Sequence, residues 1–154
     1  MTFREATSAA LLGTLTAALA LQVVPARRTN PPVSAALVSP PEVDAALRRA
    51  CYDCHSNETR WPWYSHVAPF SWLIAADVAR GRREVNFSEW GSYYSATRRR
   101  KLQWIARSFR EAKMPPWSYR LMHPDARLSD TERALLERWI ASQLSGNPIR
   151  PPDK

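Results

Sequence analysis

The residues best suited to chemistry stand in one short stretch, Cys51-Tyr52-Asp53-Cys54-His55. It contains the only two cysteines of the chain, and a histidine follows the second cysteine directly. With this spacing, the two thiols can add to the vinyl groups of a haem as thioethers, and the histidine can bind the iron from one face. A CxxC pair can also form a disulfide or supply half of a zinc site, so the spacing alone leaves three kinds of site.

Two observations help to choose among haem attachment, a disulfide and a zinc site. A structural zinc ion needs four ligands, and the sequence has no second cysteine pair. A thioredoxin-like disulfide would be expected within a βαβ unit, and the sequence shows no such pattern. Together with the export-type N-terminus described next, these observations favour the covalent attachment of one haem c.

Residues 1–26 predict a signal peptide or an uncleaved N-terminal anchor. Arg4 precedes an apolar run over residues 9–24, which only three polar side chains interrupt. Val24-Pro25-Ala26 then offers small residues at positions suited to cleavage. The run is short for a membrane span, which needs about 20 apolar residues, so cleavage is favoured and an anchor is the alternative. A buried helix of the fold fits less well, because the run has no polar face.

The rest of the chain predicts an extended linker over 27–39, a helical domain over 40–148 and a tail over 149–154. Apolar residues recur at three- and four-residue steps, and no alternating strand pattern of useful length is present. We therefore expect an all-α fold. The expected helices run from residue 40 to about 51, over 71–80 with Gly81 as the stop, from about 95 to 113, and from 130 up to Gly146. Ser39 and Ser129 each precede a glutamate by three residues, which is typical of a capping box.

Met114 is the predicted second ligand of the iron. It stands at the end of an expected helix, and Pro115-Pro116 stiffens the chain that carries it, which lowers the entropy cost of placing a ligand. Its alternative role is that of a core gap-filler. Met122, His66 and His123 are the other side chains that could ligate the iron.

Four further residues are candidates for contact with the haem. Trp61 and Trp63 could form a wall against a flat cofactor, although an ordinary aromatic core is the alternative. Tyr119 and Arg120 are candidate partners for the haem propionates, because buried carboxylates need hydrogen-bond donors.

An ordered set of residues extends over nearly the whole exported part of the chain. Its members are Arg28-Thr29-Asn30-Pro31-Pro32, the CxxCH stretch, Trp61-Pro62-Trp63-Tyr64-Ser65, Pro69-x-Ser71-Trp72, Gly81-Arg82, Asn86-Phe87-Ser88, Trp90, Met114-Pro115, Tyr119, His123-Pro124-x-Ala126-x-Leu128-Ser129 and Trp139. With this set the chain resembles the bacterial haem-binding domain family of small exported monohaem c-type proteins. The resemblance implies a cytochrome c-like helical domain around one covalently attached haem. It further implies attachment at Cys51 and Cys54 and axial ligation by His55, and it supports Met114 as the second ligand.

The net charge of +8 is compatible with binding to nucleic acid, anionic lipid or an acidic protein. The export-type N-terminus disfavours nucleic acid. We expect a redox partner that is acidic or membrane-bound, and membrane association through the N-terminal segment is a further prediction. The basic run Arg98-Arg99-Arg100-Lys101 is either a solvated helix face or part of a docking surface.

These observations predict single-electron transfer through a His/Met-ligated iron in a periplasmic, secreted or inner-membrane-anchored protein. We expect no enzymatic activity, because no Ser/His/Asp arrangement, phosphate loop or paired-carboxylate pattern stands out. Two alternatives remain. One is a haem peroxidase or ligand sensor with a displaceable sixth ligand, and the other is a non-catalytic haem module of a respiratory complex.

Overall fold

The computed structural model describes residues 3–146, and every regular element in this range is a helix. The predicted all-α class is therefore confirmed, while the predicted tail over 149–154 lies outside the described residues. The chain divides into two compact units. One comprises Met1–Thr29 and Trp61–Asp77, and the other comprises Asn30–Arg60 and Val78–Lys154.

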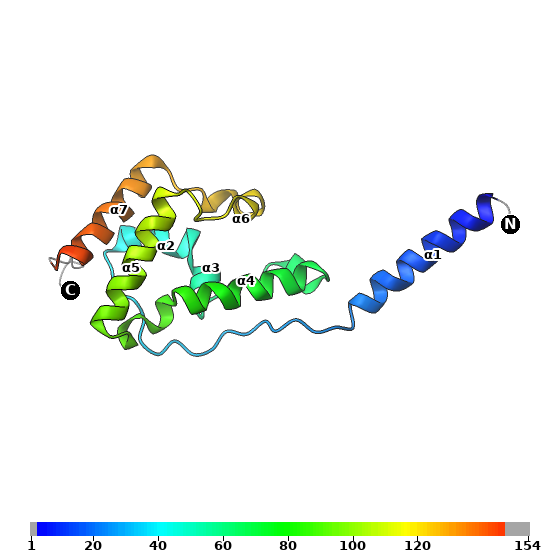
Figure 1. Cartoon of the computed structure of the whole chain (residues 1–154), viewed down its shortest axis with the longest axis horizontal. Coiled ribbons are helices and arrows are strands. Elements are labelled where there is room, and N and C mark those ends of the chain that lie inside the picture. The colour runs from blue at the N-terminus through cyan, green and yellow to red at the C-terminus, as the bar shows by residue number, and fades with distance from the viewer. Residues whose placement is uncertain (1–2, 147–154) are drawn as a thin grey trace. The chain divides into compact units, whose positions relative to one another are not determined.

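The first unit contains α1 (Phe3–Leu21), the 3-10 helix η1 (Trp63–His66) and the beginning of α4 (Phe70–Glu84). The α1 helix, blue in Figure 1, has no buried residue and leads into a stretch without regular structure. No helix within residues 3–146 is both long enough and apolar enough to cross a membrane.

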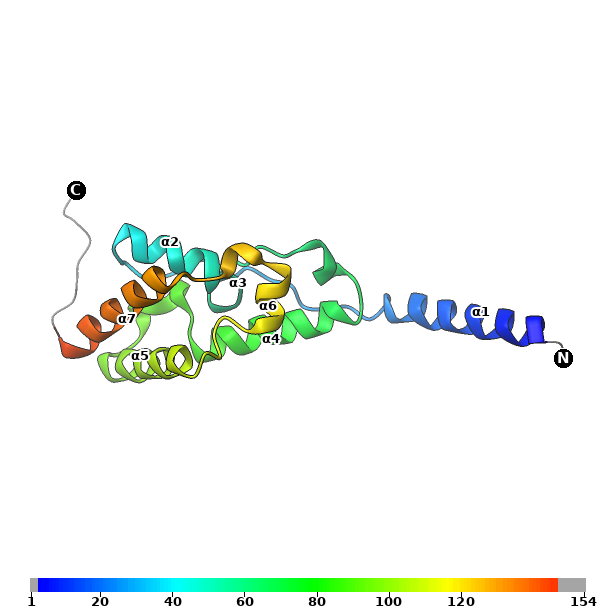
Figure 2. The ribbon, with the colours of Figure 1, turned by 90° about the horizontal axis from the view of Figure 1, so that it is seen from above.

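The second unit is built around α7. Its elements are α2 (Pro41–Ala50), α3 (Tyr52–His55), the end of α4, η2 (Phe87–Ser92), α5 (Ser95–Arg110), α6 (Trp117–Met122), η3 (Pro124–Ala126) and α7 (Asp130–Ser145). The α7 helix packs against both α2 and α5 (Figures 1 and 2). Leu47 of α2, Leu102 of α5, and Leu136 and Trp139 of α7 are buried in the shared core. This packing holds α2, and hence the cysteine stretch that follows it, in a fixed place.

Two predictions about helix ends were wrong. The α4 helix does not stop at Gly81 but continues to Glu84, because a single glycine costs a helix only about 1 kcal/mol. Ser39 does not cap α2. The cap position belongs to Pro40, no side-chain hydrogen bond caps the helix, and the Ser39 hydroxyl is buried without a hydrogen-bond partner among the described residues. The predicted capping box at Ser129 is confirmed, since its side chain and that of Glu132 bond to each other's backbone N–H.

Candidate functional site

Cys51, Cys54 and His55 are positioned by one short helix. Cys51 follows the last residue of α2, and its own carbonyl accepts the backbone N–H of Cys54 at 3.2 Å and of His55 at 2.9 Å. Because Cys51 and Cys54 are three residues apart in this turn, their side chains lie on one side of α3. The two cysteines form no disulfide within the described residues, and burial raises the pKa of the Cys51 thiol to about 12. The arrangement is that expected for two attachment points beside one iron ligand.

The His55 ring is buried and held through one of its nitrogens. Its Nδ1 lies 2.9 Å from the carbonyl oxygen of Gly81 and 3.2 Å from that of Val85. Carbonyl oxygens only accept hydrogen bonds, so Nδ1 must carry the proton and the lone pair stays on Nε2. Burial lowers the pKa of His55, which favours the neutral ring. A neutral imidazole whose outer N–H bonds to a carbonyl is the usual form of a metal-ligating histidine.

Gly81 allows this close approach between α4 and α3. A Cβ atom at Gly81 would overlap the carbonyl oxygen of Cys54 and come within 3.0 Å of its carbonyl carbon. Both atoms belong to the backbone and have little room to move. Reasoning from sequence missed this role, although a glycine inside an apolar-periodic helix is a known sign of close packing.

Asp53, the second variable residue of the CxxCH stretch, ties neighbouring segments to α3. It accepts the Tyr119 hydroxyl of α6 at 2.7 Å, and it also accepts the backbone N–H and the guanidinium of Arg60 at 3.1 and 3.2 Å. Burial, followed by the Asp53 carboxylate, raises the pKa of Tyr119. The structure therefore places Tyr119 beside the CxxCH helix, while its bond to a haem propionate stays a prediction. Sequence reasoning did not identify Asp53, because the CxxCH pattern leaves its position unconstrained.

The short helix α6 has the surface that a large flat cofactor would cover. None of its residues is buried, and Trp117, Leu121 and Met122 are exposed, Trp117 by 73%. On the same helix, the Nε of Arg120 is buried without a hydrogen-bond partner among the described residues. A buried donor without a partner calls for an acceptor, and a propionate would supply one. These residues fit a haem, which is apolar apart from its carboxylates.

The structure gives only the location and exposure of the other predicted haem contacts, Met114, Trp61 and Trp63. Met114 lies half-buried in the connection between α5 and α6, in the same unit as His55. Trp61 and Trp63 belong to the other unit, where Trp63 is exposed and its ring lies edge-on to that of Tyr64. Ligation by Met114 and a haem-facing wall of tryptophans stay predictions. Within residues 3–146, no three His, Cys, Asp or Glu side chains are grouped as metal ligands.

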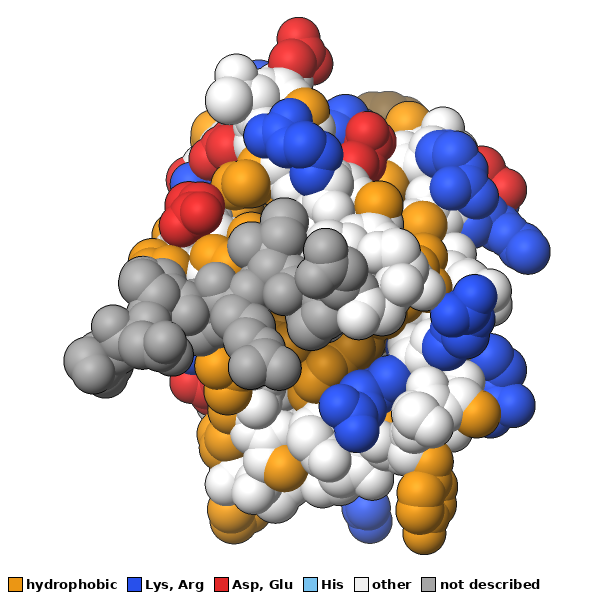
Figure 3. All heavy atoms as spheres, turned by 90° about the vertical axis from the view of Figure 1, so that its left-hand side faces the viewer, with side chains coloured by type: hydrophobic (Ala, Val, Ile, Leu, Met, Phe, Trp, Pro, Cys, Tyr) orange, Lys and Arg blue, Asp and Glu red, His pale blue; other side chains and the backbone are white. Residues whose placement is uncertain are grey.

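The basic run at the start of α5 has a structural role that the sequence did not reveal. The Lys101 ammonium bonds to the carbonyl oxygens of Arg83 and Glu84 at the end of α4, and Arg99 donates to the carbonyl of Leu144 at the end of α7. Cations at helix C-termini are favourable, so these side chains support neighbouring helices. On the face drawn in Figure 3, Lys and Arg side chains are spread widely, with acidic side chains among them in its upper part.

A family model described as a haem-binding domain matches residues 16–142, which is most of the chain. No curated protein and no solved structure matches it.

Proposed function

The chain belongs to the haem-binding domain family, and from this premise we propose that it is a monohaem c-type protein that transfers single electrons. In this proposal Cys51 and Cys54 hold the haem as thioethers, and His55 and Met114 bind the iron from opposite faces. The protein acts in the periplasm or at the outer face of the inner membrane.

The environment of His55 supports this proposal most directly. The carbonyls of Gly81 and Val85 fix the ring and its tautomer, so Nε2 is the atom left to bind iron. A histidine that served only the core would be expected to use both ring nitrogens for hydrogen bonds. Cys54 lies on the same short helix as this ligand and Cys51 is the cap residue of that helix, a placement that suits covalent attachment.

The remaining residues would orient the cofactor and exclude water from it. The apolar side chains of α6 would cover the ring, and the Arg120 guanidinium would neutralise a propionate. Asp53, by binding Tyr119, keeps α6 attached to the CxxCH helix. A haem with histidine and methionine ligands supplies one-electron chemistry at its iron, and the chain tunes the potential through ligation and burial.

The net charge of +8 favours an acidic or membrane-bound redox partner. Attraction between opposite charges speeds the encounter of two proteins and is screened by salt. The rate of reduction by the native donor should therefore fall as ionic strength rises. A rate independent of salt would count against this class of partner.

Axial ligation is tested by absorption spectra of the full chain, produced with haem-maturation machinery. Met114→Ala should remove the near-infrared band that reports a methionine–iron bond and convert low-spin iron to high-spin or water-ligated iron. Met122→Ala tests the other candidate sulfur, which lies on α6; with Met114 as the ligand, this variant should keep the near-infrared band and the low-spin state.

An unchanged spectrum of Met114→Ala would remove Met114 from the proposal. A change in Met122→Ala alone would assign the ligand to α6 instead. Rapid binding of carbon monoxide by the unaltered protein would favour the peroxidase or sensor alternative over electron transfer, because it shows a displaceable sixth ligand.

A further inference from the structure

Beyond its first turn, which carries Arg4 and Glu5, helix α1 presents an uncharged surface on all sides. Its leucines are exposed, Leu11 by 72% and Leu12 by 66%, and the opposite side carries alanine, glycine and threonine. Residues 6–26 contain no charged side chain. The leucine side of this helix can enter lipid, and no charged side chain within residues 6–21 opposes contact with acyl chains. Arg4 at one end and the exposed Arg27 at the other suit anionic headgroups.

The chain that follows α1 is bound to the first unit by the side chain of Gln22. Its amide oxygen accepts the backbone N–H of Ala68 at 2.9 Å, and its amide nitrogen lies 3.4 Å from the Ala68 carbonyl oxygen. The same nitrogen bonds to the carbonyl of Ala18 in the last turn of α1. One side chain thus connects the end of the helix to the segment before α4.

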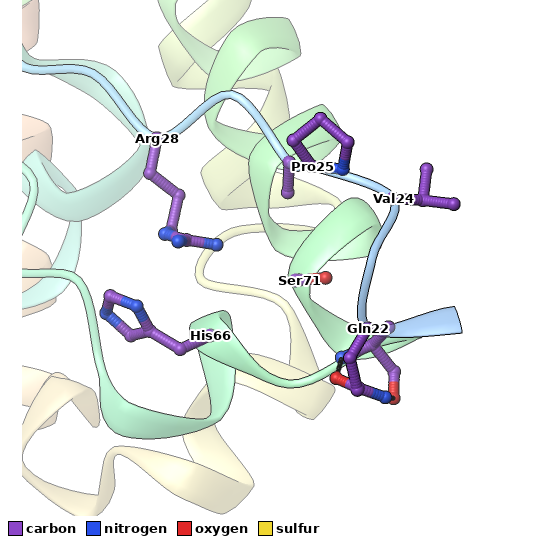
Figure 4. A pocket seen from close by; sticks show the side chains of 8 residues that line it. Gln22, Val24, Pro25, Arg28, His66 and Ser71 are labelled. Carbon is purple, nitrogen blue, oxygen red and sulfur yellow. Dashed lines mark hydrogen bonds between the residues drawn. The ribbon is translucent and has the colours of Figure 1, made fainter. Parts of the chain in front are cut away.

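Two more hydrogen bonds continue this attachment. The indole N–H of Trp72 donates to the Val24 carbonyl at 3.1 Å, and the Arg28 guanidinium donates to the Ser65 carbonyl at 2.9 Å. Between the two chain segments lies a cavity of about 110 Å³, with Gln22, Val24 and Arg28 on one side of it and His66 and Ser71 on the other (Figure 4). This volume is too small for a porphyrin, because ligand pockets measure about 300–1,000 Å³. The cavity therefore belongs to the attachment of residues 22–28.

We propose that α1 stays on the mature protein and is embedded in lipid, with residues 22–28 as a clamped stem. Cleavage after Ala26 would discard Gln22 and Val24 and leave the Ala68 N–H and the Trp72 indole without these partners. The family match begins at residue 16 and so includes the end of α1 and the predicted cleavage region. Because α1 is not both long enough and apolar enough to span a membrane, it is placed in lipid without crossing it. This placement does not depend on the haem.

The first test is the mass of the mature protein. The full chain is produced with its own N-terminus in a bacterium that exports proteins and matures c-type haem. The intact mass should include residues 3–26. A mature chain beginning at Arg27 would overturn the proposal.

The clamp is tested by limited proteolysis of a double variant, Gln22→Leu with Trp72→Phe. Losing these hydrogen bonds raises the population of the detached stem and should speed cleavage within residues 22–28 about tenfold or more. Gln103→Leu is the control, because Gln103 is an exposed glutamine on α5, and its cleavage rate should equal that of the wild type. Equal rates in the double variant and the control would overturn the clamp.

Lipid binding is tested by flotation with vesicles of phosphatidylcholine and phosphatidylglycerol. The full chain should float with the vesicles and remain bound in high salt, because burial of apolar surface is not screened. Replacing Leu11, Leu12, Leu15 and Leu19 by serine should release it. A chain that stays monomeric without lipid and fails to float when vesicles are added would overturn the assignment to lipid. So would a chain that self-associates through α1 and does not bind the vesicles.

Discussion

Gly81 determines how closely α4 approaches the helix that carries Cys54 and His55. The carbonyl of Gly81 receives the His55 ring N–H, and the space where its side chain would stand is filled by the Cys54 backbone. Gly81 therefore accepts the hydrogen bond from His55 and, because it has no side chain, also lets the two helices lie close enough to form that bond. A change in Gly81 should alter the orientation of His55 as well as the stability of the fold.

Gly81→Ala should lower the free energy of unfolding by about 1–3 kcal/mol, because overpacking against backbone atoms forces the two helices apart. It should also reduce the amount of haem held by the protein. Urea unfolding and the ratio of haem to polypeptide measure the two effects. Gly13→Ala is the matched control, since Gly13 is also helical and an added Cβ there meets no atom within 4 Å. Equal stability and haem content in both variants would contradict the role assigned to Gly81.

Sequence reasoning at this scale identified residues whose chemistry depends on local spacing. The positions of Cys51, Cys54 and His55 follow from their order alone. The roles of Gly81 and Asp53 were not predicted, because each residue contacts a partner more than 20 residues away. Gly81 contacts Cys54, and Asp53 contacts Tyr119. A single sequence does not state which distant segments meet.

At the scale of elements, α2 and α7 are joined by a polar link at the edge of their shared core. Arg49 of α2 pairs with Glu132 of α7 and donates to the carbonyl of Asp125 at 2.6 Å. Glu132 also accepts the Ser129 N–H at 2.9 Å as part of the capping box. The Ser129 backbone, followed by Arg49, lowers the pKa of Glu132 to about 2. The Glu132 carboxylate thus caps the N-terminus of α7 and connects α7 to α2, the helix that precedes Cys51.

This link should depend on pH. Because the pKa of Glu132 is lower in the folded state than its ordinary value of 4.5, its contribution to stability is complete above about pH 5 and is lost as the pH falls toward 2. At pH 7, Glu132→Gln should cost roughly 1 kcal/mol, a modest value because solvent screens this partly exposed side chain. The difference from the wild type should shrink steadily in urea unfolding at pH 7, 4 and 2.5.

Glu137→Gln serves as the control for that series, because Glu137 is exposed on the same helix. Its effect on stability should be small at every pH. A cost of Glu132→Gln that stays constant from pH 7 to pH 2.5 would show that the charge of Glu132 is not responsible.

The C-terminus of α4 should depend on Lys101 of α5. Lys101→Met keeps the apolar part of the side chain but removes the donors to the carbonyls of Arg83 and Glu84, and should cost about 0.5–1 kcal/mol. Arg100→Met removes an exposed neighbouring cation that bonds to Thr97 within α5, and it should change stability by less than about 0.5 kcal/mol. Equal costs in urea unfolding would argue for general charge effects instead of a specific cap.

Helix ends were predicted best where a local rule decides them. The Ser129 capping box involves residues three apart, and it formed as expected. The end of α4 was mispredicted because the rule for a terminal glycine ignores what lies beside it, and here packing against Cys54 explains the glycine. The basic run of α5 was expected to be a solvated face or part of a docking surface, whereas Lys101 and Arg99 bond to the ends of two other helices.

At the scale of the whole molecule, the all-α class and membership of the haem-binding domain family agree with the sequence pattern. Helical periodicity and the order of motifs are distributed along the entire chain, so they predict the class well. The division into two units was not predicted, because it depends on residues 61–77 joining the N-terminal segment across an intervening stretch of chain. Net charge and composition describe the surface as a whole and do not identify a partner.

The central claim is that Cys51 and Cys54 hold a haem covalently, and the most direct measurement is the intact mass after denaturation. The full chain, produced with haem-maturation machinery, should retain the mass of one haem after extraction with acidified organic solvent. Replacing both cysteines by serine should release the haem into the solvent, while Met114→Ala should keep it bound. A wild-type chain that loses its haem on denaturation, or never acquires one, would contradict the account.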